Sequence, residues 1–113
     1  MHEMSITMSM LDIIREHMER NGACRLRSVQ IRVGELTAVE PESLRFCFEV
    51  CSQGTPLAGA ALDIEEIPHT GKCRDCGSEF RIEGFVPHCP ACGGSSADRV
   101  AGNELDIVSM EVD

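Results

Sequence analysis

Seven cysteines occur in the 113-residue chain, and four of them form two Cys-x-x-Cys pairs separated by twelve residues: Cys73 and Cys76, then Cys89 and Cys92. Two residues between cysteines allow one tight turn to direct both sulfurs at a single ion, so the two pairs predict one four-thiolate metal site. Four sulfurs complete a tetrahedral shell and leave no open position. The predicted metal is therefore structural rather than catalytic.

The ligands alone do not decide which metal is bound, because thiolates hold zinc and iron in similar tetrahedra. The Cys-Pro-Ala-Cys-Gly sequence of residues 89–93 resembles the knuckle of rubredoxins, which favours iron. The chain has only four Phe and neither Trp nor Tyr to build an aromatic shell around the site, so we expect zinc. His88 and His69 are minor candidates as additional ligands.

The segment Met1-His2-Glu3 has a specific chemistry at a free N-terminus. The α-amine, the backbone nitrogen of His2 and its imidazole can close a five- and a six-membered chelate ring on one ion. Nitrogen donors in one plane suit Ni(II) or Cu(II), and Glu3 can supply a further ligand. These three residues cannot name the metal, and chain termini are commonly unliganded.

The hydrophobic pattern predicts two helices and three strands. Helices are expected over residues 5–20 and from the Glu-Pro-Glu of residues 40–42 to the Gly-Thr-Pro of 54–56; strands are expected over 29–33, from residue 62, and over 105–112. Residues 68–101 are rich in Cys, Gly and Pro and read as an insert. The expected fold class is α+β, with a nickel-binding domain (1–67 plus 102–113) and an inserted zinc-ribbon domain (68–101).

The first helix has two apolar stripes. Its main stripe is predicted to be buried and comprises Met4, Met8, Leu11, Ile14 and Met18. The opposite stripe, Ile6, Met10 and Ile13, fits either burial within the domain or contact with a partner. In the second helix Cys47 and Cys51 lie one turn apart on the apolar stripe, and we expect core thiols there rather than metal ligands.

The formal charge of −9 makes binding to a phosphate backbone improbable on electrostatic grounds and favours metal cations or proteins with basic patches as partners. No apolar run approaches the length of a membrane span, and no signal peptide is recognisable. We therefore expect a cytoplasmic protein with reduced cysteines, no membrane association and no nucleic-acid partner.

Taken together, the sequence resembles the HypA/HybF family of hydrogenase maturation nickel metallochaperones. The resemblance runs nearly end to end: Met1-His2-Glu3, Val33-Gly34-Glu35-Leu36, Phe46-Cys47-Phe48-Glu49, Leu62-Asp63-Ile64-Glu65 and the four cysteines of the two pairs. It implies that Met1, His2 and Glu3 bind transported Ni²⁺ and that the cysteines bind structural Zn²⁺. It further implies delivery to the [NiFe]-hydrogenase large subunit together with the accessory GTPase HypB. This chain lacks a P-loop, so it is not itself that GTPase. The resemblance to a metal carrier implies that it is not an enzyme.

Two other interpretations stay open at this stage. A zinc-ribbon adaptor would bind proteins without handling nickel, and a rubredoxin-like electron carrier would bind iron. The sequence does not determine whether the chain forms a weak homodimer, or whether a hydrogenase or a urease is served.

Overall fold

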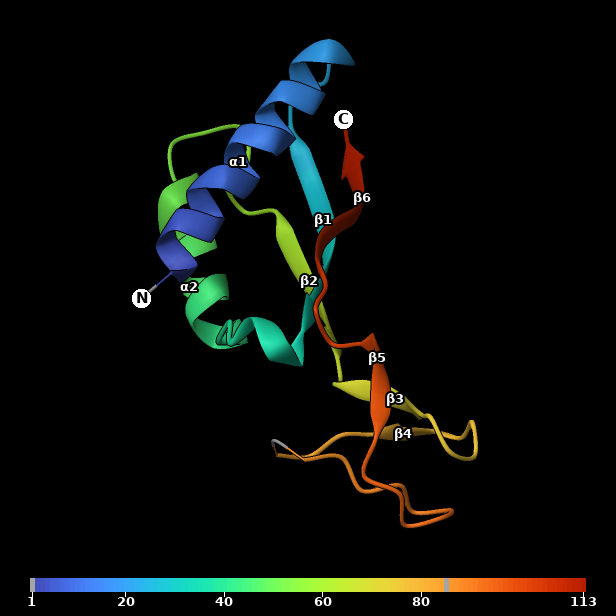
Figure 1. Cartoon of the computed structure of the whole chain (residues 1–113). Helices are drawn as coiled ribbons and strands as arrows, with labels where there is room; N and C mark the ends of the chain where they lie inside the picture. Colours follow the sequence, from blue (N-terminus) through green and yellow to red (C-terminus); the bar gives the residue numbers. More distant parts are fainter. Residues whose placement is uncertain (1, 85) are drawn as a thin grey trace. The chain divides into compact units, whose positions relative to one another are not determined.

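The computed structural model describes residues 2–84 and 86–113, which form two compact units (Figure 1). The helical unit comprises the chain up to Arg32, Val39–Glu65 and Asp106–Asp113. The cysteine unit comprises Val33–Ala38 and Glu66–Leu105. No helix in the described part of the chain is long and apolar enough to cross a membrane.

Two helices and a three-stranded sheet build the helical unit. The elements follow the order α1 (Glu3–Arg20), β1 (Leu26–Gly34), α2 (Pro41–Ser52), β2 (Ala61–Ile67) and β6 (Leu105–Val112), and the sheet order is β2-β1-β6. The last strand thus lies beside the first. This architecture confirms the α+β class with two helices and three strands, and it confirms that residues far apart in sequence close one sheet.

The N-terminus of α2 shows why the sequence begins a helix there. Pro41 occupies the first helical turn, where its missing N–H is not needed, and the Glu40 carboxylate accepts a hydrogen bond from the Glu42 N–H at 3.3 Å. Beyond this cap Leu44, Cys47 and Phe48 are buried. The predicted start and the predicted apolar stripe of this helix are both confirmed, with Cys51 half-buried at the end.

The buried face of α1 differs from the prediction. Leu11, Ile14 and Met18 are buried as expected, but Met4 and Met8 are 44% and 51% exposed. The face is completed instead by three residues from outside the predicted stripe: Glu3, Thr7 and Met10. Two polar residues belong to the buried face, and an apolar stripe cannot include them. The apolar stripe alone therefore predicted an orientation of α1 that is rotated about the helix axis by part of a turn.

The cysteine unit contains a second small sheet. Strand β3 (Thr70–Cys73) pairs antiparallel with β4 (Glu79–Arg81) and with β5 (Ala97–Ala101), in the order β4-β3-β5. Its buried cluster consists of Cys73, Phe80, Ile82 and Cys89, with Ala97 packed against it. A core this small depends on a further cross-link for stability.

The 3₁₀ turn η1 (Glu35–Thr37) also belongs to the cysteine unit. The Gly34 N–H donates to the Glu104 carbonyl, and the Leu36 N–H donates to the Gly102 carbonyl, both at 2.7 Å. The unit defined by contacts is therefore wider than the 68–101 insert expected from composition. The functional boundary between a nickel domain and a zinc domain stays a prediction.

Candidate metal centres

The four cysteines of the two pairs come together at one point of the cysteine unit. Their sulfur atoms all lie within 4.8 Å of one another. The Cys73 and Cys92 sulfurs are 3.6 Å apart, and those of Cys76 and Cys89 are 3.5 Å apart. Sulfurs about 2.3 Å from a central zinc at tetrahedral angles would be about 3.8 Å apart. The four-thiolate arrangement therefore fits one tetrahedral metal ion.

Each pair is folded into the same kind of turn. The Gly77 N–H donates to the Cys73 carbonyl at 2.9 Å, and the Gly93 N–H donates to the Cys89 carbonyl at 2.8 Å. Both glycines have positive φ, +79° and +77°, which side chains on an L-residue disfavour. The Cys-x-x-Cys-Gly spacing is thus a backbone requirement of this turn, which places two sulfurs on one side.

Four neighbouring thiols cannot all ionise easily, because each thiolate opposes the next. Hydrogen bonds from Ser78 lower the pKa of Cys76 to about 6. At Cys92 the Gly94 N–H favours the thiolate, but the Cys73 and Cys76 thiols outweigh it and raise the pKa to about 12. A bound divalent cation removes this repulsion and holds every sulfur as thiolate, so the donor set fits a metal better than four protons.

The described residues around the cluster offer no fifth ligand. Cys73 and Cys89 are buried while Cys76 and Cys92 are exposed, and no histidine or carboxylate joins them in the same donor group. His88, a minor candidate from the sequence, is exposed and outside this group. Phe85, which lies between the two cysteine pairs in the sequence, is outside the described residues.

The predicted nickel segment lies at the start of α1. Met1 is outside the described residues, so the position of the α-amine is not part of the structure. The His2 side chain is 48% exposed, and its Nδ1 lies 3.4 Å from Oε2 of the buried Glu3 side chain. The same oxygen accepts a hydrogen bond from the backbone N–H of Glu40 at 3.4 Å. Sequence spacing gave no sign of this contact, which joins positions 37 residues apart.

The remaining cysteines form no metal group with other described residues. Cys24 is exposed, and Cys47 is buried, as expected for a core thiol. Cys51 lies 3.4 Å, sulfur to sulfur, from Met4.

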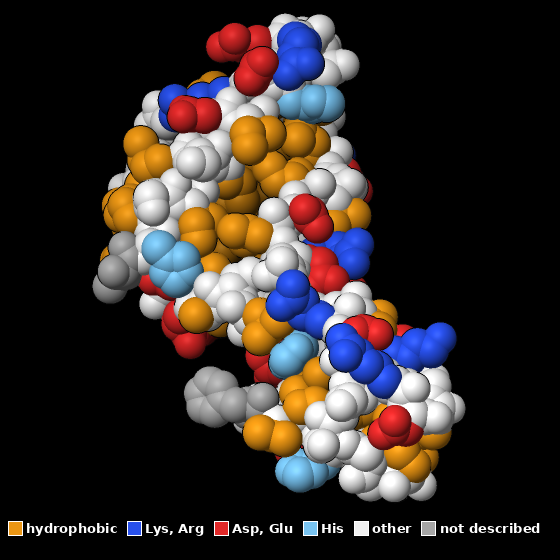
Figure 2. Space-filling view, in the orientation of Figure 1, with side chains coloured by type: hydrophobic (Ala, Val, Ile, Leu, Met, Phe, Trp, Pro, Cys, Tyr) orange, Lys and Arg blue, Asp and Glu red, His pale blue; other side chains and the backbone are white. Residues whose placement is uncertain are grey.

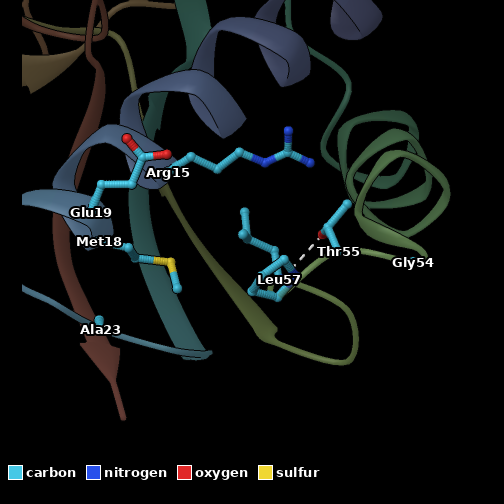
Figure 3. A pocket seen from close by; sticks show the side chains of 8 residues that line it. Arg15, Met18, Glu19, Ala23, Gly54, Thr55 and Leu57 are labelled. Carbon is cyan, nitrogen blue, oxygen red and sulfur yellow. Dashed lines mark hydrogen bonds between the residues drawn. The ribbon is translucent and has the colours of Figure 1, made fainter.

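A separate groove of about 330 Å³ runs beside α1 and the loop that follows α2. In Figure 3, Met18 and Leu57 line it and the Arg15 side chain extends across it toward Thr55. Glu19 is the one metal-binding type of side chain in this lining, so the groove is no metal centre.

Comparison with known proteins identifies relatives that match over the whole chain. Residues 1–112 match the family model described as hydrogenase/urease nickel incorporation, metallochaperone, hypA. A hydrogenase maturation factor HypA from Geotalea uraniireducens is 42% identical over the full length of both chains. One from Desulfosudis oleivorans is 46% identical, covering 99% of this chain and 98% of its own.

Solved structures agree. The solution structure of the Ni metallochaperone HypA from Helicobacter pylori matches with a TM-score of 0.65 at 26% identity, covering 99% of this chain and 97% of the other. A second solution structure, of a HypA protein, matches with a TM-score of 0.69 at 26% identity, covering 99% and 96%. With a family model spanning all but the last residue, the chain belongs to the HypA family of hydrogenase/urease nickel-incorporation metallochaperones.

Proposed function

We propose that the chain binds Ni(II) at Met1, His2 and Glu3 and delivers it, in the cytoplasm, to the large subunit of a [NiFe]-hydrogenase, working with the GTPase HypB. The observation that carries the proposal is the half-exposed His2 imidazole beside the anchored Glu3 carboxylate, in a member of a nickel-incorporation family. The nickel is cargo rather than a resident cofactor. No step of the proposal requires this chain to be an enzyme.

The position of His2 supports a nitrogen chelate. His2 is the N-cap of α1, and its carbonyl accepts the Ile6 N–H at 3.0 Å. The backbone N–H groups at the start of a helix have no intrahelical acceptor. The His2 amide nitrogen can therefore be deprotonated without the loss of a helical hydrogen bond. The α-amine, this nitrogen and the imidazole then supply three nitrogen donors, with the Glu3 oxygens next to them. Such a set suits Ni(II).

The exposure of His2 fits transfer rather than storage. A resident metal is commonly enclosed, whereas a cargo ion must be reachable by the ligands of the next protein. A 48% exposed imidazole on the first turn of a helix leaves one side of the ion open to an incoming ligand. The buried Glu3 fixes the other side, because its carboxylate accepts the backbone N–H of Glu40.

For the cysteine cluster we propose Zn²⁺ bound by Cys73, Cys76, Cys89 and Cys92, with a structural role. Iron would fit the same sulfur distances, but among the described residues the cluster is covered by Phe80 and Ile82 rather than by an aromatic shell. The metal would cross-link the end of β3 and the β3–β4 turn to the loop between β4 and β5, which agrees with the small size of the core.

The test compares nickel titration of untagged protein, protein with an N-terminal extension, and the variant His2→Ala, all loaded with zinc. We expect the extension and the substitution to weaken nickel binding by at least about two orders of magnitude, since each removes a donor of the chelate. The matched control is His17→Ala, which removes an exposed histidine elsewhere on α1. Equal nickel affinity in all four proteins would leave a zinc-ribbon adaptor as the better assignment, and a red, iron-containing preparation would indicate an electron carrier.

A further inference from the structure

Four exposed apolar side chains lie on the two helices next to the nickel segment. Met4 and Met8 are one turn apart on α1, and Phe46 and Val50 are one turn apart on α2. They are 44%, 51%, 66% and 44% exposed. The helices pack against each other, and the Met4 sulfur contacts the Cys51 sulfur, next to Val50, at 3.4 Å. We name these four residues the helix ridge; Figure 2 shows hydrophobic side chains reaching the surface over this unit.

The ridge is not needed by the core. At about 100° per residue, Phe46 points away from Leu44 and Phe48, which are buried at 0% and 3% exposure. A phenylalanine with two thirds of its surface in water gains little from folding. Aromatic side chains and methionines are also the types enriched at protein–protein interfaces, where single aromatic anchors dominate the binding energy.

The ridge begins where the nickel segment ends. Met4 follows Glu3 directly, and Glu3 accepts the backbone N–H of Glu40, the N-cap of α2, which is six residues before Phe46 in the chain. Any protein that removes nickel from His2 must place its own ligands against this chain start. A partner seated on Met4 and Met8 is already within one helical turn of that position.

The charges around the ridge describe the partner. Glu42 and Glu49 lie one turn before and after Phe46 on α2, and both are exposed. The nearest basic residue, Arg45, donates to the Leu62 carbonyl of β2, and its Nε also lies 3.9 Å from the Glu42 carboxylate. Arg45 therefore offsets part of the Glu42 charge and leaves that of Glu49. The ridge is thus an apolar strip with an acidic rim. A second copy of this chain, with its net charge of −9, would place like charges against each other.

We propose that the helix ridge is the docking surface for the GTPase HypB, acting as the protein that exchanges nickel with this chain, and that the matching surface of HypB has an apolar centre and a rim of Lys and Arg. The proposal rests on the proposed function and adds the surface through which it works. Phe46 is the anchor, Met4, Met8 and Val50 are adaptable apolar contacts, and Glu42 and Glu49 steer the partner into place.

The test uses the full zinc-loaded chain and the GTPase HypB as the probe, with binding followed by calorimetry and stopped-flow fluorescence. Phe46→Ala is expected to raise the Kd about tenfold or more. The double charge reversal Glu42→Lys with Glu49→Lys is expected to slow association and to remove most of its dependence on salt. Ile13→Ala, which shortens a 55% exposed side chain on another face of α1, is the matched control and should leave the Kd unchanged.

Because Phe46 is on the surface, its removal should leave folding and zinc content intact; circular dichroism checks the fold, and a zinc assay checks the metal content. Phe46→Ala must also retain wild-type nickel affinity. Unchanged HypB binding by Phe46→Ala overturns the docking proposal. The proposal is also overturned if Phe46→Ala weakens only the association of this chain with a second copy of itself. Loss of nickel binding in His2→Ala together with unchanged HypB docking in Phe46→Ala would overturn the docking surface alone. Full nickel binding in His2→Ala would instead overturn the proposed function.

Discussion

The Glu3 carboxylate oxygen Oε2 accepts the backbone N–H of Glu40 at 3.4 Å, so the first residue of α1 is tied to the N-cap of α2. The same oxygen lies 3.4 Å from Nδ1 of His2. One buried carboxylate therefore connects the start of α1 to the start of α2. This arrangement gives Glu3 a role in folding that substitutions can separate from its proposed role in nickel binding.

Glu3→Ala is expected to lower both stability and nickel affinity. Loss of the carboxylate leaves the Glu40 N–H without its acceptor and should cost about 1–2 kcal/mol of unfolding free energy. Glu3→Gln keeps an oxygen acceptor of the same length, so it should retain most of the stability while weakening nickel binding through the lost charge. Urea unfolding and nickel titration of the two variants measure both effects. Equal stabilities for Glu3→Ala and wild type would show that the Glu40 contact contributes nothing.

A second prediction concerns acid. Glu35 accepts the backbone N–H of His69 at 3.0 Å and pairs with Arg81 at 2.7 Å. These two contacts, the hydrogen bond from His69 first, hold the pKa of Glu35 below its ordinary value of 4.5. A carboxyl with a lowered folded pKa stabilises the fold fully above 4.5, and this contribution is lost as the pH falls through the lower folded value.

The measurement is an NMR titration of the Glu35 side-chain carboxyl in wild type and in Arg81→Ala. We expect the wild-type midpoint below 4.5 and a shift back toward 4.5 in the variant, with part of the lowering kept because the His69 N–H remains. The control is Arg74→Ala, which breaks the separate pair with Asp98 in the same unit. Identical Glu35 midpoints in wild type and Arg81→Ala would contradict the assignment.

The elements of the fold could be predicted because their signals are local. The Glu40-Pro41 start and the 105–112 strand follow from cap chemistry and alternation, and both appear at the expected residues. The four-sulfur site followed from Cys-x-x-Cys spacing alone. The buried face of α1 could not be predicted, since Glu3 is buried through a hydrogen bond to Glu40 and no periodicity reports such a contact. The ion pair between Glu35 and Arg81 could likewise not be predicted from the sequence, because 46 residues separate the two side chains.

A third prediction tests how the turn before η1 is packed. A Cβ placed on Gly34 would lie 2.2 Å from the Gly102 carbonyl oxygen and 2.6 Å from the Glu104 nitrogen, both backbone atoms. Gly34→Ala must therefore push two segments apart and is expected to cost about 2 kcal/mol or more. Gly54→Ala is the control: its φ of +73° is strained, but nothing lies within 4 Å, so the cost should be about 1–2 kcal/mol from conformation alone. Urea unfolding compares them, and faster amide exchange at Leu36 in Gly34→Ala would locate the damage. A smaller cost for Gly34→Ala than for Gly54→Ala would contradict the close approach.

The last prediction separates the two units. Cys73 is buried in the small cluster with Phe80 and Ile82, and its sulfur is 3.6 Å from that of Cys92. Cys73→Ala removes a ligand and a packed side chain together, so we expect zinc release and loss of order in the cysteine unit. The helical unit has its own core, including Ile14, Leu44 and other fully buried side chains, and should keep its helices.

Circular dichroism at 222 nm and a zinc-release assay measure the outcome for Cys73→Ala. Cys24→Ala serves as the control, because that thiol is exposed and outside the cluster. This variant should retain both its zinc and its fold. Since α1 and α2 supply the helical signal and both belong to the helical unit, at least most of that signal should persist in zinc-free Cys73→Ala. Collapse of the helical signal together with zinc release would mean that the helical unit cannot fold without the metal, and the structural independence of the two units would have to be abandoned.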